Sequence, residues 1–186
     1  MRSQVVSAAK SAAILEAAQR AFLTHGLRGT SMEAIARAAG IAKPTLYAYF
    51  PDKETIYRAV IEGLTAGWFD NFATALGGEG DIARRAANAL VAKHKGVMQL
   101  LAGSPHAVEL YFSRDLAAPQ LAALEGRITA LFEVELAAAG VGRARFVTQL
   151  LLAASEGIAR RAQSPAEMGP ALRLLAERLI LPEITG

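Results

Sequence analysis

The chain has 186 residues, of which 53% are hydrophobic and 20% are charged, with a formal net charge of +3. No apolar stretch reaches the roughly 18 residues that a membrane-spanning helix needs, and charged side chains interrupt any secretory signal near the N-terminus. The absence of cysteine excludes disulfides, thiolate nucleophiles and cysteine-ligated metal sites. We therefore expect a cytoplasmic protein without a membrane partner, built as one domain or two small ones.

The positive charge is concentrated in the first third of the chain. Residues 1–55 hold seven basic and four acidic side chains, whereas the remainder holds 13 of each. An uneven distribution of this kind favours an anionic partner for the basic segment.

The elements expected in the first third are short helices. Apolar residues at helical spacing, including Ile14 and Phe22, predict a helix over about 8–25 that ends at Gly26. Thr30 to Glu33 has the pattern of a capping box, in which the Thr30 hydroxyl accepts from the Glu33 amide, and predicts a helix over about 31–38. Gly40 ends that helix, and a very short one over about 43–50 stops before Pro51.

The rest of the chain also reads as helical. Alanine is abundant and only seven prolines occur, which together favour an all-α fold. The breaks at glycine and proline, including Pro119, predict about nine helices in the whole chain. Those after residue 52 cover about 53–76, 82–102, 105–114, 117–139, 143–162 and 166–181. We divide the chain into an N-terminal part, 1–52, and a C-terminal part, 53–186.

The two short helices near residue 40 have the spacing of a helix-turn-helix. Ala36 allows close crossing, Gly40 allows the positive φ of the turn, and Leu46 points back into the joint. Turning 100° per residue from the buried Leu46 side leaves Pro44, Thr45 and Tyr47 on the outer face, with Tyr49 at its flank. Such hydroxyl and aromatic groups suit contacts to base edges and phosphates in a major groove.

Two lysines lie beside this outer face. Lys43 occupies the first turn of the short helix, and Lys53 occupies the first turn of the next. A phosphate near Lys53 would meet both its ammonium and the free amides of the helix end. The alternative is a solvated lysine screened by Asp52 and Glu54.

The same stretch resembles the TetR family of bacterial one-component regulators. The resemblance covers about residues 9–69 and is densest from Ile35-Ala36 through Ala39-Gly40-Ile41-Ala42-Lys43 to Thr45-Leu46-Tyr47-Ala48-Tyr49-Phe50 and Lys53-Glu54. It implies a three-helix DNA-binding domain whose helix-turn-helix spans 32–51. It places the DNA contacts at Thr30, Ser31, Lys43, Pro44, Thr45, Tyr47, Tyr49 and Lys53. Two departures stand out: Ala42 replaces a frequent serine cap, and Pro44 removes a backbone amide.

The resemblance also implies a helical C-terminal domain for dimerisation and ligand binding. Two recognition helices must reach half-sites about 34–36 Å apart, so we expect a homodimer on a palindromic operator. The last two helices are the expected dimer contact, the alternative being ordinary intrachain core. The expected interface residues are Leu150, Ala154, Gly157, Ile158, Leu172, Leu175 and Leu179.

A small-molecule effector site is expected among the middle helices, because most aromatic side chains and several polar ones lie there. The expected lining residues are Trp68, Phe72, His94, Met98, His106, Tyr111 and Phe112. The alternative is a plain core without a ligand. His94 and His106 lack the spacing of a metal site, and we expect neither metal nor cofactor.

The function expected from these features is a ligand-responsive transcriptional repressor, located in the bacterial cytoplasm and on the nucleoid when bound to DNA. An activating or ligand-independent regulator of the same fold remains an alternative. A helical enzyme is the less favoured reading, because the three histidines have no evident triad partners and no glycine-flanked nucleophile occurs. A sequence-neutral architectural DNA binder would need more positive charge, spread more widely.

Overall fold

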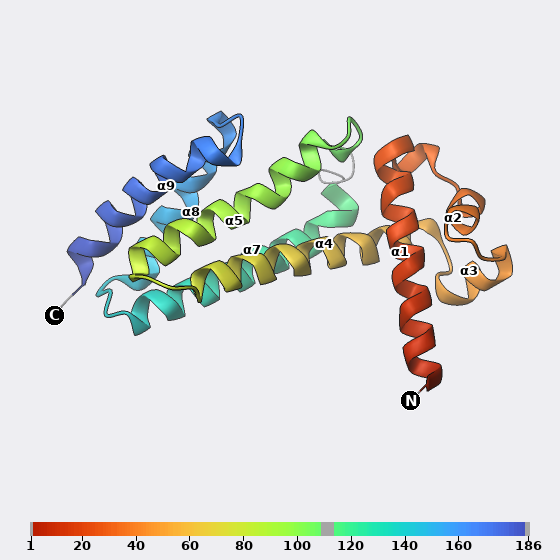
Figure 1. Ribbon diagram of the computed structural model, residues 1–186, viewed down its shortest axis with the longest axis horizontal. Helices are drawn as coiled ribbons and strands as arrows, with labels where there is room; N and C mark the ends of the chain where they lie inside the picture. The colour runs from red at the N-terminus through yellow and green to blue at the C-terminus, as the bar shows by residue number, and fades with distance from the viewer. Residues whose placement is uncertain (1, 109–113, 185–186) are drawn as a thin grey trace. The chain divides into compact units, whose positions relative to one another are not determined.

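The computed structural model describes residues 2–108 and 114–184, which form long and short helices (Figure 1). The helices are α1 (Arg2–Gly29), α2 (Met32–Ala38), α3 (Lys43–Tyr49), α4 (Lys53–Leu76), α5 (Ile82–Ala102), α7 (Arg114–Ala138), α8 (Ala144–Arg161), α9 (Pro165–Ile180) and the 3₁₀ turn η1 (Leu181–Glu183). The described residues contain no strand beyond an isolated bridge between Val141 and Ile184, and the all-α prediction is confirmed. Within the same residues, no helix is long and apolar enough to cross a membrane.

Two element boundaries differ from the sequence prediction. Helix α1 begins earlier than expected, and its range extends to Gly29 across a kink at Gly26, whose non-helical φ of 74° and ψ of 166° interrupt the helix where its end was expected. Pro119 was expected to precede a helix, but it lies inside α7, because that helix already begins at Arg114. Half of the predicted helix over 105–114 falls on residues 109–113, which lie outside the described part of the chain.

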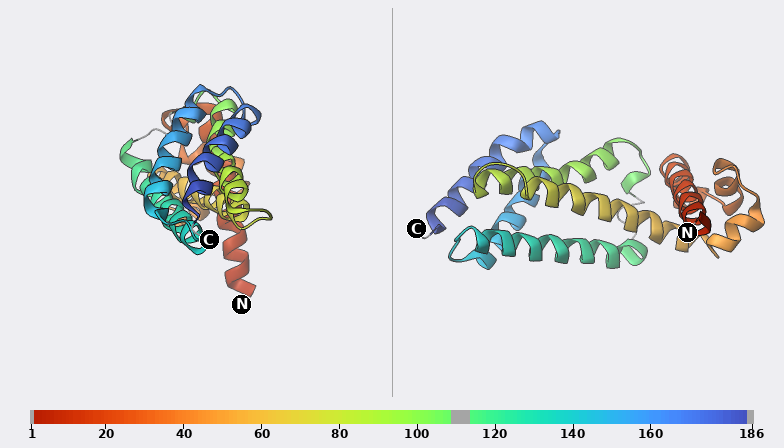
Figure 2. Two further views of the ribbon diagram at one scale, coloured as in Figure 1. Left: turned by 90° about the vertical axis from the view of Figure 1, so that its left-hand side faces the viewer. Right: turned by 60° about the horizontal axis from the view of Figure 1, so that its bottom comes forward.

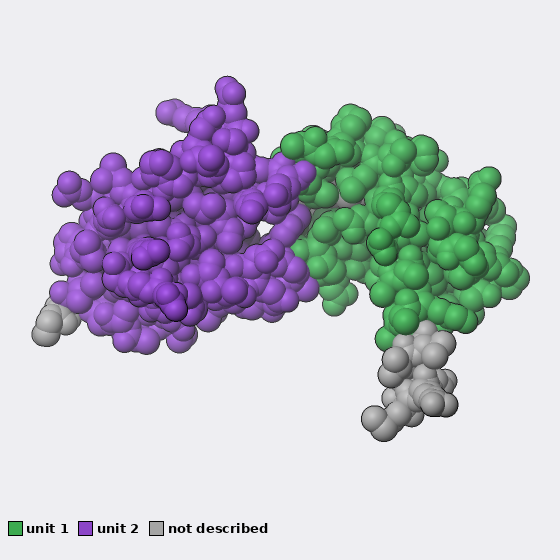
Figure 3. Space-filling model, in the orientation of Figure 1, with its two compact units in different colours: residues 1–65, 100–121 green, residues 66–99, 122–186 purple. Residues whose placement is uncertain are grey.

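The chain forms two compact units, shown in Figure 3. Unit 1 comprises residues 1–65 and 100–121, and unit 2 comprises residues 66–99 and 122–186. Helix α4 therefore contributes Lys53–Thr65 to unit 1 and its remaining residues to unit 2. These units do not follow the expected division at residues 52 and 53, and the functional roles given to those two parts stay predictions.

Unit 1 is built around an apolar core to which α1, α2, α3 and α4 all contribute. Ile14 and Phe22 of α1, Leu46 of α3 and Tyr57 of α4 are completely buried there. The rings of Phe22 and Tyr57 meet edge to face, with their centroids 6.1 Å apart. Because α3 has only seven residues, this burial, rather than its own hydrogen bonds, holds it in place.

Unit 2 is a bundle of longer helices in which α8 and α9 pack against each other (Figure 2). Its core includes the edge-to-face pair of Phe72 and Phe132, whose centroids lie 5.6 Å apart. The Trp68 ring lies over Gly96, where an added Cβ would come within 2.4 Å of the indole. A close approach of this kind requires glycine at that position.

Candidate nucleic-acid interface

The turn between α2 and α3 has the geometry expected of a helix-turn-helix. Gly40 has φ 67°, and the Ile41 amide donates to the Ala36 carbonyl at 3.0 Å, which closes the turn. Ala36 is 3% exposed and Leu46 is completely buried, so the small residue and the large apolar residue fill the joint as predicted. Helices α2 and α3 therefore meet through Ala36, Gly40 and Leu46, the three positions that the sequence pattern identified.

The outer face of α3 presents the side chains that the sequence placed there. Lys43, Pro44 and Tyr47 are exposed, with Tyr47 at 43%, and Thr45 is half-buried. Tyr49 packs partly against the core of unit 1 and so lies at the flank of this face. The predicted orientation of α3 is confirmed, while contact of these residues with DNA stays a prediction.

The first turn of α3 is held by a side chain of α2 rather than by a helix cap. Ala42 makes no side-chain capping bond, as its methyl group requires. Instead the Lys43 ammonium donates to the Glu33 carboxylate and lies 5.9 Å from the centroid of the Tyr47 ring. This hydrogen bond lowers the pKa of the Glu33 carboxyl and raises the pKa of Lys43.

The expected capping box at Thr30 is wrong by one residue. Ser31 is the N-cap of α2, and its hydroxyl accepts from the Ala34 amide at 3.1 Å. The Thr30 side chain is buried, and its hydroxyl contacts the carbonyls of Gly26 at 2.8 Å and Ala21 at 3.2 Å. Because that hydroxyl points into the protein, Thr30 shapes the loop before α2 and offers DNA no side-chain donor.

Lys53 also has a structural role that the sequence reasoning missed. Its ammonium donates to the Leu27 carbonyl at 2.7 Å and to the Thr30 carbonyl at 2.8 Å, which ties the start of α4 to the loop before α2. An ammonium has three donors, so one remains for a phosphate. The alternative of a merely solvated lysine is therefore wrong, because Lys53 ties two segments of unit 1 together, while its contact with a phosphate stays a prediction.

Two charged residues of α2 were not in the predicted contact set. Glu33 is the partner of Lys43, and Arg37 is exposed one turn further along α2. Arg37, Arg20 and His25 line the rim of a groove of about 440 Å³ between α1 and α2. The sequence did hold a signal for this exposed face. Glu33 and Arg37 are spaced i, i+4, on the side of α2 opposite the buried Met32, Ile35 and Ala36.

The residues predicted to line an effector site are divided between the units. Trp68, Phe72, His94 and Met98 belong to unit 2, whereas His106 belongs to unit 1. Tyr111 and Phe112 lie outside the described residues. Phe72 is completely buried against Phe132 and is therefore core.

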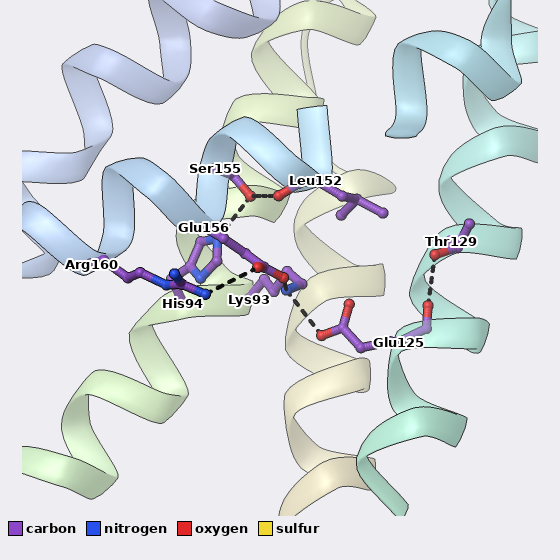
Figure 4. Close-up of polar contacts among 8 residues, drawn as sticks. All are labelled: Lys93, His94, Glu125, Thr129, Leu152, Ser155, Glu156 and Arg160. Carbon is purple, nitrogen blue, oxygen red and sulfur yellow. Dashed lines mark hydrogen bonds and ion pairs between the residues drawn. The ribbon is translucent and has the colours of Figure 1, made fainter. Parts of the chain in front are cut away.

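His94 belongs to a buried polar network of α5, α7 and α8 in unit 2, drawn in Figure 4. Its Nε2 lies 2.9 Å from the Ser155 hydroxyl, which itself donates to the Leu152 carbonyl at 2.8 Å. Since the serine proton is used there, His94 Nε2 carries the proton that it donates to Ser155. Burial, with a smaller effect of the Lys93 charge, lowers the pKa of His94 to about 4.

Lys93, next to His94, is paired across the same three helices. Its ammonium lies 3.0 Å from a Glu125 carboxylate oxygen of α7 and 3.9 Å from one of Glu156 on α8 (Figure 4). The Lys93 side chain is 9% exposed, and the two carboxylates offset the cost of burying it. The sequence reasoning did not predict this network, because helical periodicity does not reveal which helices meet.

The residues predicted for a dimer contact fall into two groups. On α8, Leu150 and Gly157 are exposed, and Ala154 and Ile158 are half-buried. On α9, Leu175 and Leu179 are half-buried, but Leu172 is completely buried inside its own unit and is not available to a partner. The structure also exposes two large apolar residues that were not predicted, Phe146 and Leu174.

The architecture and the turn geometry are those of an all-α protein that contains a helix-turn-helix. Residues 14–60 match the family model described as "Bacterial regulatory proteins, tetR family". The HTH-type transcriptional regulator RutR of Escherichia coli (strain K12) is 46% identical over 67 residues, which are 36% of this chain and 31% of RutR. The regulator EthR of Mycolicibacterium smegmatis is 42% identical over 55 residues, covering 30% of this chain and 25% of EthR.

Solved structures extend the similarity of the fold to almost the whole chain. A regulator of the TetR/AcrR family from Thermobifida fusca superposes with a TM-score of 0.68 at 20% identity, covering 92% of this chain and 96% of that one. Salmonella enterica GusR gives 0.66 at 23% identity, covering 92% and 95%. The match to the tetR family therefore lies in residues 14–60, and the similarity of the rest of the chain is one of fold. These curated relatives are regulators rather than enzymes, in agreement with the prediction, although the sequence matches span less than a third of their lengths.

Proposed function

We propose that the protein is a DNA-binding transcriptional repressor that acts as a homodimer on a palindromic operator and is released by a small hydrophobic or amphipathic effector. The observation that supports DNA binding most directly is the outer face of α3. Lys43, Thr45 and Tyr47 project from one short helix whose opposite side is anchored by the buried Leu46. A rigidly held helix with outward donors is the arrangement that reads base edges in a major groove.

Residues beside α3 supply contacts to the DNA backbone. The Ser31 side chain is exposed at the start of α2, where its hydroxyl oxygen accepts from the Ala34 amide. Lys53 retains one ammonium donor at the start of α4. Contacts of this type fix the position of a protein on the duplex, while the base contacts of α3 supply the sequence preference.

The homodimer is supported by the apolar surface of α8 and α9. Phe146 is 51% exposed and Leu150 lies one turn further along α8, while Leu174 of α9 is 56% exposed. Large apolar side chains at such exposure are costly in water and favour burial against a second copy. A dimer would give the two α3 helices that a palindromic operator needs.

The effector is supported by the polar network inside unit 2. His94 and Ser155 are buried polar groups among apolar helices, and the Thr148 hydroxyl has no hydrogen-bond partner among the described residues. A few polar groups within an apolar bundle can orient a small amphipathic molecule. Such a ligand would act by favouring a conformation in which DNA binding is weaker.

The test of DNA binding is a selection from a library of duplexes with a random central segment. The wild-type protein should enrich an inverted repeat and bind it at least about a thousandfold more tightly than random duplex at physiological salt. Thr45→Ala and Tyr47→Ala should lose affinity for the enriched duplex while keeping their affinity for random duplex.

Val134→Ala serves as the control, because Val134 is an exposed apolar residue of α7 in unit 2. It should bind like the wild type. Equal affinity of the wild-type protein for enriched and random duplexes would exclude a sequence-specific repressor. For the effector, a panel of hydrophobic and amphipathic small molecules can be screened by the fluorescence of Trp68, the single tryptophan, and by release of the enriched duplex.

A further inference from the structure

An acidic side chain stands directly beside the basic end of α3. Glu33 of α2 accepts a hydrogen bond from Lys43 of α3, ten positions further along the chain. The two side chains are 54% and 52% exposed, so both can meet a molecule that docks on α3. The contact is tertiary and joins the two helices of the helix-turn-helix at their outer edge.

A carboxylate in this position works against attraction to the DNA backbone. Phosphates repel Glu33, and the ion pair with Glu33 offsets the positive charge of Lys43. If this surface only had to bind phosphates, it would bind them more tightly without Glu33. Its place beside Lys43 therefore points to selectivity rather than to strength of binding.

Glu33 also limits where the Lys43 ammonium can point. Ala42 provides no cap, and the described contacts of the ammonium are the Glu33 carboxylate and the face of the Tyr47 ring. One of its three donors is used by Glu33, which leaves two for an outside partner. The O6 and N7 atoms of guanine form a pair of acceptors in the major groove that two such donors can satisfy.

We propose that Glu33 is a specificity-determining positioning residue, which holds the Lys43 ammonium for a guanine edge and keeps it from phosphate oxygens. This inference rests on the proposed function, because it concerns DNA read by α3. On a duplex without guanine at that position, Lys43 stays paired with Glu33, and the pair adds little to the attraction between the protein and the DNA. With guanine there, Lys43 binds its acceptors without leaving Glu33.

The experiment compares Glu33→Gln with Glu54→Gln in the random-duplex selection. Glu54 is an exposed acid in the first turn of α4, so its substitution changes the net charge equally without affecting Lys43. For Glu33→Gln we expect preference for guanine at one position of each half-site to fall about tenfold. Its affinity for random duplex should rise, and the slope of log affinity against log salt should steepen by about 0.9. Glu54→Gln should keep the wild-type preference and slope.

A second comparison tests whether Glu33 acts through Lys43. Lys43→Gln should lose the same guanine preference, and adding Glu33→Gln to it should change neither preference nor salt slope further. Thermal unfolding of each variant checks that the helix-turn-helix is intact. If Glu33 had only a structural role, its substitution would alter stability without altering base preference.

The outcomes separate this inference from the proposed function. If the wild type and Glu54→Gln enrich the same half-site and Glu33→Gln enriches it with an unchanged salt slope, the role of Glu33 is overturned while the repressor remains. An effect of Glu33→Gln that persists in the Lys43→Gln background also overturns it. If the wild type enriches no sequence, both the proposed function and the role of Glu33 fail.

Discussion

The α2–α3 region of unit 1 and the α8–α9 region of unit 2 differ in how strictly the structure constrains the residue at each position. In the first region a few positions have fixed physical tasks: Gly40 takes a positive φ, Leu46 fills the joint, and Tyr47 must face outward. In the second region long helices rich in alanine and leucine pack, and many apolar residues would serve equally well. The match to the family model accordingly falls on residues 14–60, which include the first region and none of the second.

The two units also differ in how they treat polar groups. Unit 1 keeps the charges of α2 and α3 at the surface, where the ion pair of Glu33 and Lys43 is half-exposed. Unit 2 buries Lys93, His94 and Ser155 between α5, α7 and α8. Buried ionisable groups couple folding to proton binding much more strongly than exposed ones. Unit 2 should therefore be the part of the molecule that is more sensitive to mild acid.

The largest effect that we expect is the response of unit 2 to acid. Because the pKa of His94 is about 4 in the folded protein against 6.5 as its ordinary value, the folded state resists protonation. The stability from His94 is complete above pH 6.5 and is lost as the pH falls toward 4. The loss amounts to about 2–3 kcal/mol at pH 4. Urea unfolding of the wild type and of His94→Gln between pH 7 and pH 4 measures it.

His94→Gln is informative because glutamine can still donate to the Ser155 hydroxyl but does not titrate. The variant should lose less stability than the wild type over the same pH range, since it lacks the one histidine whose burial opposes protonation and keeps the other titratable groups. If the stability of the two proteins depends on pH in the same way, His94 is not the group that makes the protein sensitive to acid. The expected difference in acid sensitivity between the units would then be wrong.

The elements that sequence reasoning predicted well are those set by local geometry. The break in the helix at Gly26, the positive φ of Gly40 and the outward direction of Tyr47 follow from turn chemistry and helical periodicity, and all three are confirmed. Thr30 was misplaced because Thr30 and Ser31 are both good caps, and only the path of the loop decides which hydroxyl faces α2.

Tertiary contacts account for what the sequence could not provide. The carbonyls that bind Lys53 lie 23 and 26 positions away, and the His94 contact with Ser155 spans 61 positions. Leu172 shares its apolar stripe with Leu175 and Leu179, but periodicity alone does not tell which side of α9 meets α8. The fold class was predictable from composition and spacing, whereas these pairings depend on how helices meet.

The second prediction tests close packing in unit 2. Gly96→Ala would place a Cβ within 2.4 Å of the Trp68 ring, so the ring must move, at a cost of about 2 kcal/mol. Gly126→Ala is the matched control, because no atom lies within 4 Å of the added Cβ. The first change should lower the urea midpoint and shift the fluorescence of Trp68, while the second should leave the fluorescence unchanged. Equal stability of both variants would contradict the tight seating of Trp68.

The third prediction concerns the loop clamp of unit 1. Lys53→Met removes two hydrogen bonds from a charged donor to the Leu27 and Thr30 carbonyls, and we expect a loss of about 1.5 kcal/mol. Lys10→Met is the control for lost charge, because Lys10 is exposed on α1. Hydrogen exchange of the amides from Leu27 to Ala34 should accelerate in Lys53→Met only. If the exchange of these amides is unchanged, Lys53 does not stabilise the loop, and contact with a phosphate is the role that is left for it.

The smallest expected effect distinguishes packing within a protomer from packing between protomers. Gly157 and Gly126 both lie within helices of unit 2, and an added Cβ meets no atom within 4 Å at either position. Alanine at either site should therefore stabilise a single protomer by about 0.5–1 kcal/mol, since glycine is the poorer helix former. If α8 faces a second copy as proposed, only Gly157→Ala should also weaken the dimer, because its methyl group enters the contact. Sedimentation over a range of protein concentrations measures this, and identical association of the two variants would place the dimer contact away from Gly157.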